Sequence, residues 1–242
     1  MNPNTKTVTF FGASGGVGLS ALKHTLAAGY QCIALCRQPS KLTSIFPEST
    51  PNLKVIEGNA HDVEAVSKCL VSKDGKIVDV VLSTLGSRPN MRKMSIEDPE
   101  VCQKGAAALI KALDNLQSDG VTGKPHIIMF GTTGISRFGR DYPIAVFPIY
   151  HWMLKVPHVD KRITEDRFAD SGRPFTIVRA SLLTTGETTK KVRVGIEDPK
   201  TGRESEAIGY AISREDSGKW VAENLILRTE KQYVNKIAMI TN

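Results

Sequence analysis

The chain has 242 residues, a formal net charge of +7 and 40% hydrophobic residues, enough to bury the core of a single α/β domain. Its basic residues form no run of five, so the charge favours small acidic or phosphorylated ligands over nucleic acid. No apolar stretch reaches the roughly 18 residues that a membrane span needs. The four cysteines lack metal-ligand spacing. We therefore expect a cytoplasmic protein, monomer or homodimer, that binds a small molecule and neither nucleic acid, membrane nor metal.

Strand and helix signals alternate along the chain. An apolar strand at 8–11 runs into the glycine-rich segment 12–18, and a helix follows at 19–28. The further predicted elements are strands at 31–36, 53–58, 78–83, 126–130, 175–179 and 234–240, with helices at 61–71, 99–116, 159–169 and 213–227. Strands separated by helices predict an α/β fold with a doubly wound parallel sheet, the Rossmann fold, in one domain spanning 1–242. The weakly patterned stretch 184–209 is predicted to be a small surface excursion that covers a substrate.

The segment 12–18, GASGGVG, has the pattern of a dinucleotide-binding turn. In such a turn the first glycine allows a tight reversal, the second lets the backbone approach a pyrophosphate, and the third lets the helix pack on the strand. Free N–H groups and the positive end of the helix dipole then face the phosphates. We therefore predict that the nucleotide is bound by Gly12, Ser14, Gly15, Gly16, Val17 and Gly18.

The residue after the second strand distinguishes between the two pyridine dinucleotides. An acidic residue there holds the free ribose 2′-hydroxyl of NAD, whereas an arginine accommodates the 2′-phosphate of NADP. The segment 19–47 contains no acidic residue, and Arg37 follows the strand, with Lys41 close behind. A planar guanidinium makes paired, charge-assisted hydrogen bonds to phosphate. The sequence therefore predicts NADP(H), with a solvated arginine at a strand end as the alternative.

In a doubly wound sheet the ligand lies outside the carboxyl ends of the strands. Four predicted strands end in small, amide or hydroxyl residues, which suit close approach to a ligand but also occur in ordinary turns. We predict that the nucleotide is also contacted by Asn59, Ala60, Leu85, Gly86, Ser87, Arg88, Thr132, Ala180, Ser181 and Leu182.

Motifs along nearly the whole chain match the pattern of a known family. They are GASGGVG (12–18), ALCRQPSKL (34–42), GNAHD (58–62), LGSR (85–88), DSGRPFTIVRASLL (170–183) and ISREDSGKWVAENL (212–225). Together they resemble the atypical short-chain dehydrogenase/reductases, and within them the NmrA-like and biliverdin reductase B (flavin reductase) branch. The resemblance implies a single NAD(P)-binding domain and NADPH-dependent reduction. It also admits non-redox isomerisation and nucleotide sensing.

Hydride transfer needs a proton donor beside the developing oxyanion. Many members of the family that the chain resembles use a tyrosine four residues before a lysine, but here Pro157 stands four before Lys161. Solvent is the alternative donor, as in the open sites of flavin and biliverdin reducers. The candidate catalytic residues are Thr132, Thr133, Tyr150, His158 and Lys161. Apolar packing of Tyr150 and a surface position of His158 are the alternatives for those two residues.

The favoured function is NADPH-dependent reduction of a carbonyl, quinone, flavin or similar aromatic metabolite. Aromatic residues that follow the fifth strand support a flat substrate, and they are Phe138, Tyr142, Phe147, Tyr150 and Trp152. The substrate is thus expected to be aromatic or acidic. One alternative is a non-redox isomerase, dehydratase or cyclase of secondary metabolism. The other is an NmrA-like, NADP-sensing interaction protein.

Overall fold

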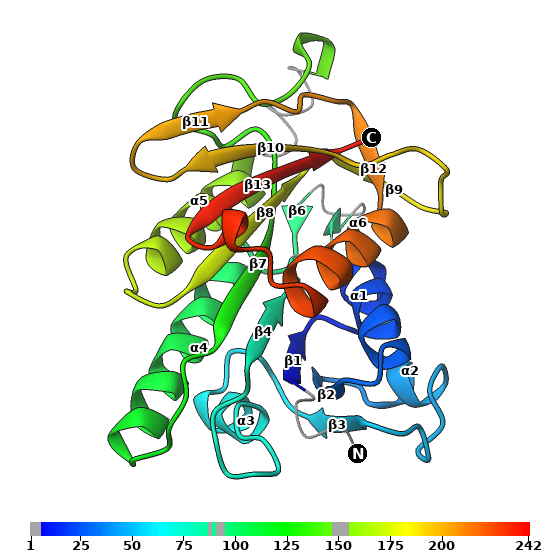
Figure 1. Ribbon diagram of the computed structural model, residues 1–242, viewed down its shortest axis with the longest axis vertical. Coiled ribbons are helices and arrows are strands. Elements are labelled where there is room, and N and C mark those ends of the chain that lie inside the picture. The colour runs from blue at the N-terminus through cyan, green and yellow to red at the C-terminus, as the bar shows by residue number, and fades with distance from the viewer. Residues whose placement is uncertain (1–5, 87–88, 91–94, 147–154) are drawn as a thin grey trace.

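In the computed structural model, which describes residues 6–86, 89–90, 95–146 and 155–242, nine strands of these residues form one sheet (Figure 1). Its order is β11-β10-β13-β8-β7-β4-β1-β2-β3. The strands are β1 (Thr7–Phe11), β2 (Gln31–Cys36), β3 (Leu53–Glu57), β4 (Val80–Ser83), β7 (His126–Thr132), β8 (Phe175–Ala180), β10 (Arg193–Asp198), β11 (Gly202–Ser205) and β13 (Lys236–Thr241). All neighbours from β3 to β13 pair in parallel, whereas β10 and β11 add antiparallel at the edge.

Two small sheets lie beside the main one. Antiparallel β5 (Pro89–Asn90) and β6 (Ser95–Ile96) form one, and parallel β9 (Leu182–Thr184) and β12 (Ala211–Ser213) form the other. The helices are α1 (Gly16–Ala27), α2 (Ser40–Thr43), α3 (Val63–Cys69), α4 (Val101–Ser118), α5 (Lys155–Ala169) and α6 (Arg214–Val221). A π-helical turn, η3 (Ala222–Leu227), extends α6, and the 3₁₀ turns are η1 (Ile144–Val146) and η4 (Lys231–Tyr233).

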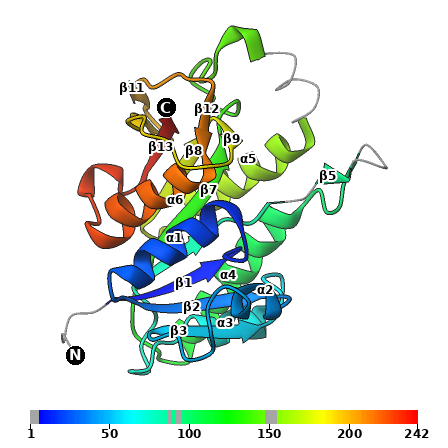
Figure 2. The same cartoon turned by 90° about the vertical axis from the view of Figure 1, so that its right-hand side faces the viewer.

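Helices cover both faces of the sheet, as the continuous apolar strands predict. On one face, α1 and α6 pack over Val8 and Phe10 of β1, in a cluster that also contains Trp220. On the other face, α3, α4 and α5 pack over Phe11, in a cluster that contains Phe168 of α5 (Figure 2). The predicted Rossmann fold is confirmed.

The stretch 184–209 differs from the predicted excursion, because it contains β10 and β11 and so extends the main sheet. The sequence pattern does not indicate these strands, because a charged residue such as Glu197 predicts a surface position. In the structure Glu197 lies in β10 and is only 1% exposed. The predicted helix 159–169 also begins earlier, at Lys155, and runs through Pro157. Proline is tolerated there because the first turn of a helix needs no N–H donor.

The segment of α6 at Gly218 lies unusually close to α1. A Cβ on Gly218 would lie 2.5 Å from the carbonyl oxygen of Val17 and 2.7 Å from the backbone nitrogen of Ala21. The hydroxyl of Ser20 donates a hydrogen bond of 2.8 Å to the carbonyl of Glu215. Glycine at 218 therefore brings the amino end of α6 against the amino-terminal half of α1.

Substituting Gly218→Ala should destabilise the protein. The added methyl group meets backbone atoms of α1 that cannot move aside, and overpacking of this kind costs about 1–3 kcal/mol. Urea unfolding measures the effect. Gly86→Ala is the matched control, because a Cβ there meets no atom of the described residues within 4 Å. Equal stability of the two variants would show that α6 can shift away from α1 without cost.

Candidate functional site

A cavity of about 1030 Å³ runs along the carboxyl ends of β1, β2, β3, β4, β7 and β8. This is at the upper end of the roughly 300–1,000 Å³ range of small-molecule sites. Of the residues predicted to contact the nucleotide, those that line it are Gly12, Ser14, Gly15, Gly16, Val17, Gly18, Arg37, Lys41, Asn59, Ala60, Leu85, Gly86, Thr132, Ala180, Ser181 and Leu182. Ser87 and Arg88 lie outside the described residues. No described residue of 185–209 is part of this lining.

The glycine turn closes against Thr84 at the end of β4. Gly12 has a φ of 90°, and a Cβ on it would lie 2.7 Å from the Thr84 Oγ1 atom. A Cβ on Gly18 would lie 2.5 Å from both that oxygen and the carbonyl oxygen of Gly12. The Thr84 hydroxyl lies 3.1 Å from the carbonyl oxygens of Phe11 and Gly12, to which it donates. The first and last glycines thus have the steric roles that the sequence predicts.

The middle of the turn faces open space. A Cβ on Gly15 would meet nothing within 4 Å, and Gly15 lines the cavity. The first bond of α1 runs from the Leu19 N–H to the Gly15 carbonyl at 3.2 Å. The N–H groups before Leu19 therefore have no intrahelical acceptor. A ligand phosphate can approach this backbone directly, at the positive end of the helix dipole.

The cavity wall carries positive charge. Arg37 and Lys41 are exposed side chains after β2, and Lys161 and Arg214 line other parts of the wall. Among the described lining residues there is no aspartate or glutamate. This distribution suits a ligand with several phosphate groups, since each unpaired cation is available to an anion.

Lys161 projects from α5 to the ends of β4 and β7. Its Nζ atom donates to the carbonyl oxygen of Phe130 at 2.8 Å and lies 3.4 Å from that of Leu85. The preceding residue, Asp160, fixes α5 against α4 by accepting hydrogen bonds from the N–H groups of Cys102 and Gln103, at 2.9 and 3.0 Å. Asp160 thereby caps α4 from another helix and holds Lys161 at the cavity wall.

The other candidate catalytic residues divide into three groups. Thr132 lines the cavity together with Lys161, whereas Thr133 is buried and its N–H donates to the Ala180 carbonyl at 2.9 Å. His158 is also buried and is not part of the cavity lining. Burial, with the positive charges of Arg162 and Lys161, lowers the pKa of His158 to about 4, so it is neutral at physiological pH. Tyr150 lies outside the described residues.

The predicted aromatic cluster does not form a wall of the cavity in the described part of the chain. Phe138 packs on Gly202 of β11, where a Cβ would lie 3.3 Å from the Phe138 ring. Tyr142 is not among the residues that line the cavity. Phe147, Tyr150 and Trp152 lie outside the described residues. The apolar residues that line the cavity include instead Leu85, Val101, Phe130, Leu182 and Leu183.

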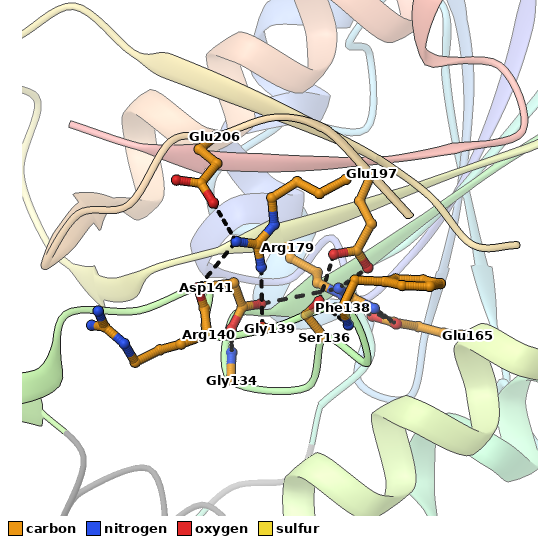
Figure 3. A network of polar contacts seen from close by, with 11 residues as sticks. Gly134, Ser136, Phe138, Gly139, Arg140, Asp141, Glu165, Arg179, Glu197 and Glu206 are labelled. Atoms are coloured by element: carbon orange, nitrogen blue, oxygen red, sulfur yellow. Dashed lines mark hydrogen bonds and ion pairs between the residues drawn. The ribbon is translucent and has the colours of Figure 1, made fainter. Parts of the chain in front are cut away.

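Behind the cavity, Arg179 of β8 joins three carboxylates in a buried network (Figure 3). Its guanidinium donates to Glu165 of α5 and to Glu197 of β10, each at 2.7 Å, and lies 4.0 Å from Asp141. Burial lowers the pKa of Arg179, but Glu165, Glu197 and Asp141 together outweigh this and raise it, so the arginine stays charged. Burial raises the pKa of Glu165 and of Asp141, and Arg179 opposes both shifts.

Gly131 separates this network from the cavity. A Cβ on Gly131 would lie 3.0 Å from the Glu165 Oε1 atom, and the same residue lines the cavity. Glu165 follows Lys161 by one turn of α5. The network therefore supports the end of β7 and the helix that carries the lysine, while its negative charges stay behind the cavity wall.

Sequence reasoning missed several lining residues. Three of them, Thr84, His61 and Gln38, are next in sequence to predicted site residues. Their position in the same turns is the signal that could have identified them. Arg214 lies far along the chain, in the segment ISREDSGKW. That segment was a sign of family resemblance, but only the packing of α6 on α1 reveals that its arginine reaches the cavity.

A glycine turn after the first strand of a doubly wound sheet, with a cationic cavity at the strand ends, defines a Rossmann-type dinucleotide-binding protein. The chain belongs to the NAD(P)H-binding family, whose model matches residues 12–226.

Relatives and solved structures agree with this assignment. The chain is 38% identical to "Reductase pytE" of Aspergillus terreus over 268 residues, covering 100% of each chain. It is 30% identical to "Oxidase pynE" of Aspergillus niger, covering 97% of this chain and 98% of the relative. Its fold is similar to that of a short-chain dehydrogenase/reductase from Veillonella parvula solved in complex with NADP. The TM-score is 0.73, at 17% identity, with 98% of this chain and 94% of the other covered. The fold implied by the family resemblance is thus confirmed.

Two further structural findings concern the described residues. None of their helices combines the length and apolar character of a membrane span. They also contain no group of three or more histidine, cysteine, aspartate or glutamate side chains placed to hold a metal ion.

Substituting Gly15→Val should weaken cofactor binding and leave the fold intact. The side chain would enter open cavity space, so it obstructs the approach of a pyrophosphate without displacing protein atoms. We expect the affinity for NADPH to fall at least tenfold, about 1.4 kcal/mol, by isothermal titration calorimetry. Thermal unfolding without ligand is the control and should be unchanged. Retained affinity would show that the phosphates lie elsewhere.

Substituting Asp141→Asn should change how stability depends on pH. The pKa of Asp141 is raised in the folded protein, so its contribution to stability declines as pH rises above the ordinary carboxyl range. The variant lacks this decline. The free energy of unfolding of the variant, relative to wild type, should therefore increase as the pH rises above the ordinary carboxyl range. Asp74→Asn, at an exposed loop, is the control and should give a constant difference.

Proposed function

We propose that the protein is an NADPH-dependent oxidoreductase that reduces a carbonyl, quinone, flavin or similar aromatic metabolite. The observation that carries the proposal is the cavity itself, with a glycine turn open toward it and Lys161 in its wall. Four cations and no described carboxylate line its wall. Relatives named as a reductase and an oxidase support a redox reaction.

Preference for NADPH over NADH is proposed from the end of β2. Arg37 and Lys41 are exposed there and line the cavity. No described acidic side chain lines this end to hold a free 2′-hydroxyl. A 2′-phosphate placed between these cations would form charge-assisted hydrogen bonds with the guanidinium. The NADP complex of the similar Veillonella parvula protein supports the same choice.

Some residues of the cavity would bind the cofactor, and others would bind the substrate. When bound, NADPH supplies a hydride to an electron-poor carbon of the substrate. The glycine turn and Arg37 would hold the phosphate groups, and Asn59 and Ala60 would line the adenine. Leu182 and Leu183, each half-buried, would offer an apolar surface for a flat substrate beside Lys161.

Proton supply would follow from the chemistry of the described wall. Four residues before Lys161, Pro157 replaces the tyrosine that would donate a proton, and the described lining contains no tyrosine. The Lys161 ammonium would stabilise developing negative charge on the substrate, while Thr132 would orient it. Water reaching the cavity would then supply the proton.

The discrimination between cofactors can be tested with Arg37→Ala. Hydrogen bonds to charged groups contribute about 1.5–3 kcal/mol, so affinity for NADPH should fall about tenfold to a hundredfold. Affinity for NADH should stay within about twofold, because it has no 2′-phosphate. Calorimetric titration of both nucleotides measures the ratio. Equal losses for the two would refute the role of Arg37.

Turnover distinguishes the proposed reaction from the other functions of the family. Oxidation of NADPH, one equivalent per substrate reduced, is expected with a panel of quinones, flavins and aromatic ketones. Conversion of a substrate without loss of NADPH would instead indicate a non-redox enzyme. Nucleotide binding with no turnover across the panel would favour a sensing protein.

Lys161→Ala should reduce kcat at least tenfold, equivalent to about 1.4 kcal/mol of barrier. The affinity for NADPH should change less, since the lysine acts on the substrate half of the cavity. Arg162→Ala is the control, because Arg162 is the next residue in the chain and its side chain is exposed. A loss of nucleotide affinity equal to the loss of kcat would contradict a role in the reaction.

A further inference from the structure

Arg214, the first residue of α6, lies against the glycine turn although it is distant in sequence. Its Cδ atom is 3.3 Å, and its Nε atom 3.9 Å, from the position that a Cβ on Gly16 would occupy. Arg214 also lines the cavity. The side chain therefore reaches the cavity at the same place as the open backbone of the turn.

Contacts from several directions hold the arginine there. The N–H of Asp216 bonds to the Ser213 hydroxyl, which caps α6, and Gly218 brings that helix close to α1. The Nη1 atom of Arg214 donates to the carbonyl of Thr184, at the end of β9, at 3.0 Å. Together these contacts fix the direction of the side chain before any ligand binds.

The charge of Arg214 is unfavourably placed in the protein alone. Cations are destabilising near the positive amino end of a helix, and Arg214 lies at the amino ends of both α6 and α1. Acidic Glu215 and Asp216 follow in the first turn of α6, and Asp216 accepts a hydrogen bond of 2.8 Å from the Thr188 hydroxyl. Among the described residues, no carboxylate forms an ion pair with Arg214. A guanidinium has five N–H donors, so most remain available to an anion.

We propose that Arg214 binds the pyrophosphate of the dinucleotide, as an anchor separate from Arg37. This inference rests on the proposed function. Arg37 follows β2 and would serve the 2′-phosphate, which only NADP carries. Arg214 lies over Gly16, at the turn that approaches the pyrophosphate, which NADP and NAD share. The two arginines therefore recognise different parts of the cofactor, one giving selectivity and the other affinity.

The two roles predict opposite patterns with a small set of ligands. Arg214→Ala should lower the affinities for NADPH and NADH by the same factor, about tenfold or more. The affinity for 2′-AMP, which has no pyrophosphate, should stay unchanged. Arg37→Ala should instead weaken NADPH and 2′-AMP while leaving NADH unchanged. Dissociation constants from calorimetry, or from competition with NADPH fluorescence, give all six comparisons.

Matched variants separate the binding role from general effects. Lys219→Ala removes the same charge from an exposed position of α6 and should leave both affinities unchanged. Arg214→Lys should recover part of the loss, since it restores the charge without the fork of donors. Because Arg214 also bonds to Thr184, thermal unfolding is measured for each variant. Arg214→Gln keeps a donor for that carbonyl and must show the same loss as alanine.

The outcomes distinguish failure of this inference from failure of the proposed function. Loss of NADPH affinity without loss of NADH affinity would place Arg214 at the 2′-phosphate and overturn the inference. Unchanged affinity for both nucleotides in folded Arg214→Ala would overturn it too, while the proposed function stands. A wild-type protein that binds neither nucleotide would refute both.

Discussion

The close approach of three elements at the glycine turn determines the geometry of the site. Gly12 and Gly18 leave no room for a Cβ beside Thr84, so the ends of β1 and β4 and the start of α1 are in direct backbone contact. The Thr84 hydroxyl joins them by donating to the carbonyls at the end of β1. Because the turn is compact on this side, its opposite side at Gly15 is open. The cavity along the sheet begins there.

Charge is segregated around this cavity by the sheet itself. The cations face the ligand space, whereas the carboxylates of Glu165, Glu197 and Asp141 are held by Arg179 behind Gly131. Buried ion networks are weak evidence for added stability, since desolvation offsets attraction. Here the arrangement also keeps negative charge away from the cavity. The same arginine joins β8 to α5 and to β10, the strand next to the edge strand β11, so this side of the sheet supports the helix that presents Lys161.

The parallel sheet and the glycine turn that opens onto the cavity were predictable because their signals are local. Apolar runs mark strands that are buried on both faces, and a glycine turn between a strand and a helix has few other uses. Strands β10 and β11 were not predictable. In β10 polar and apolar residues are mixed, and the charged Glu197 is buried because it forms an ion pair with Arg179 of β8. Arg214 was missed for a related reason. Its place depends on the contact between α1 and α6, which no short-range pattern encodes.

The pairing of β9 with β12 has a consequence for how this cavity can be altered. Leu182 and Leu183 of β9 offer the apolar wall, and β12 leads directly into Arg214, whose guanidinium holds the last carbonyl of β9. Both halves of the ligand space thus share one scaffold of six paired residues. A change that reshapes the wall for a bulkier metabolite also shifts the arginine. On the role proposed for Arg214, engineering of substrate range in this protein has to treat nucleotide affinity as a linked trait.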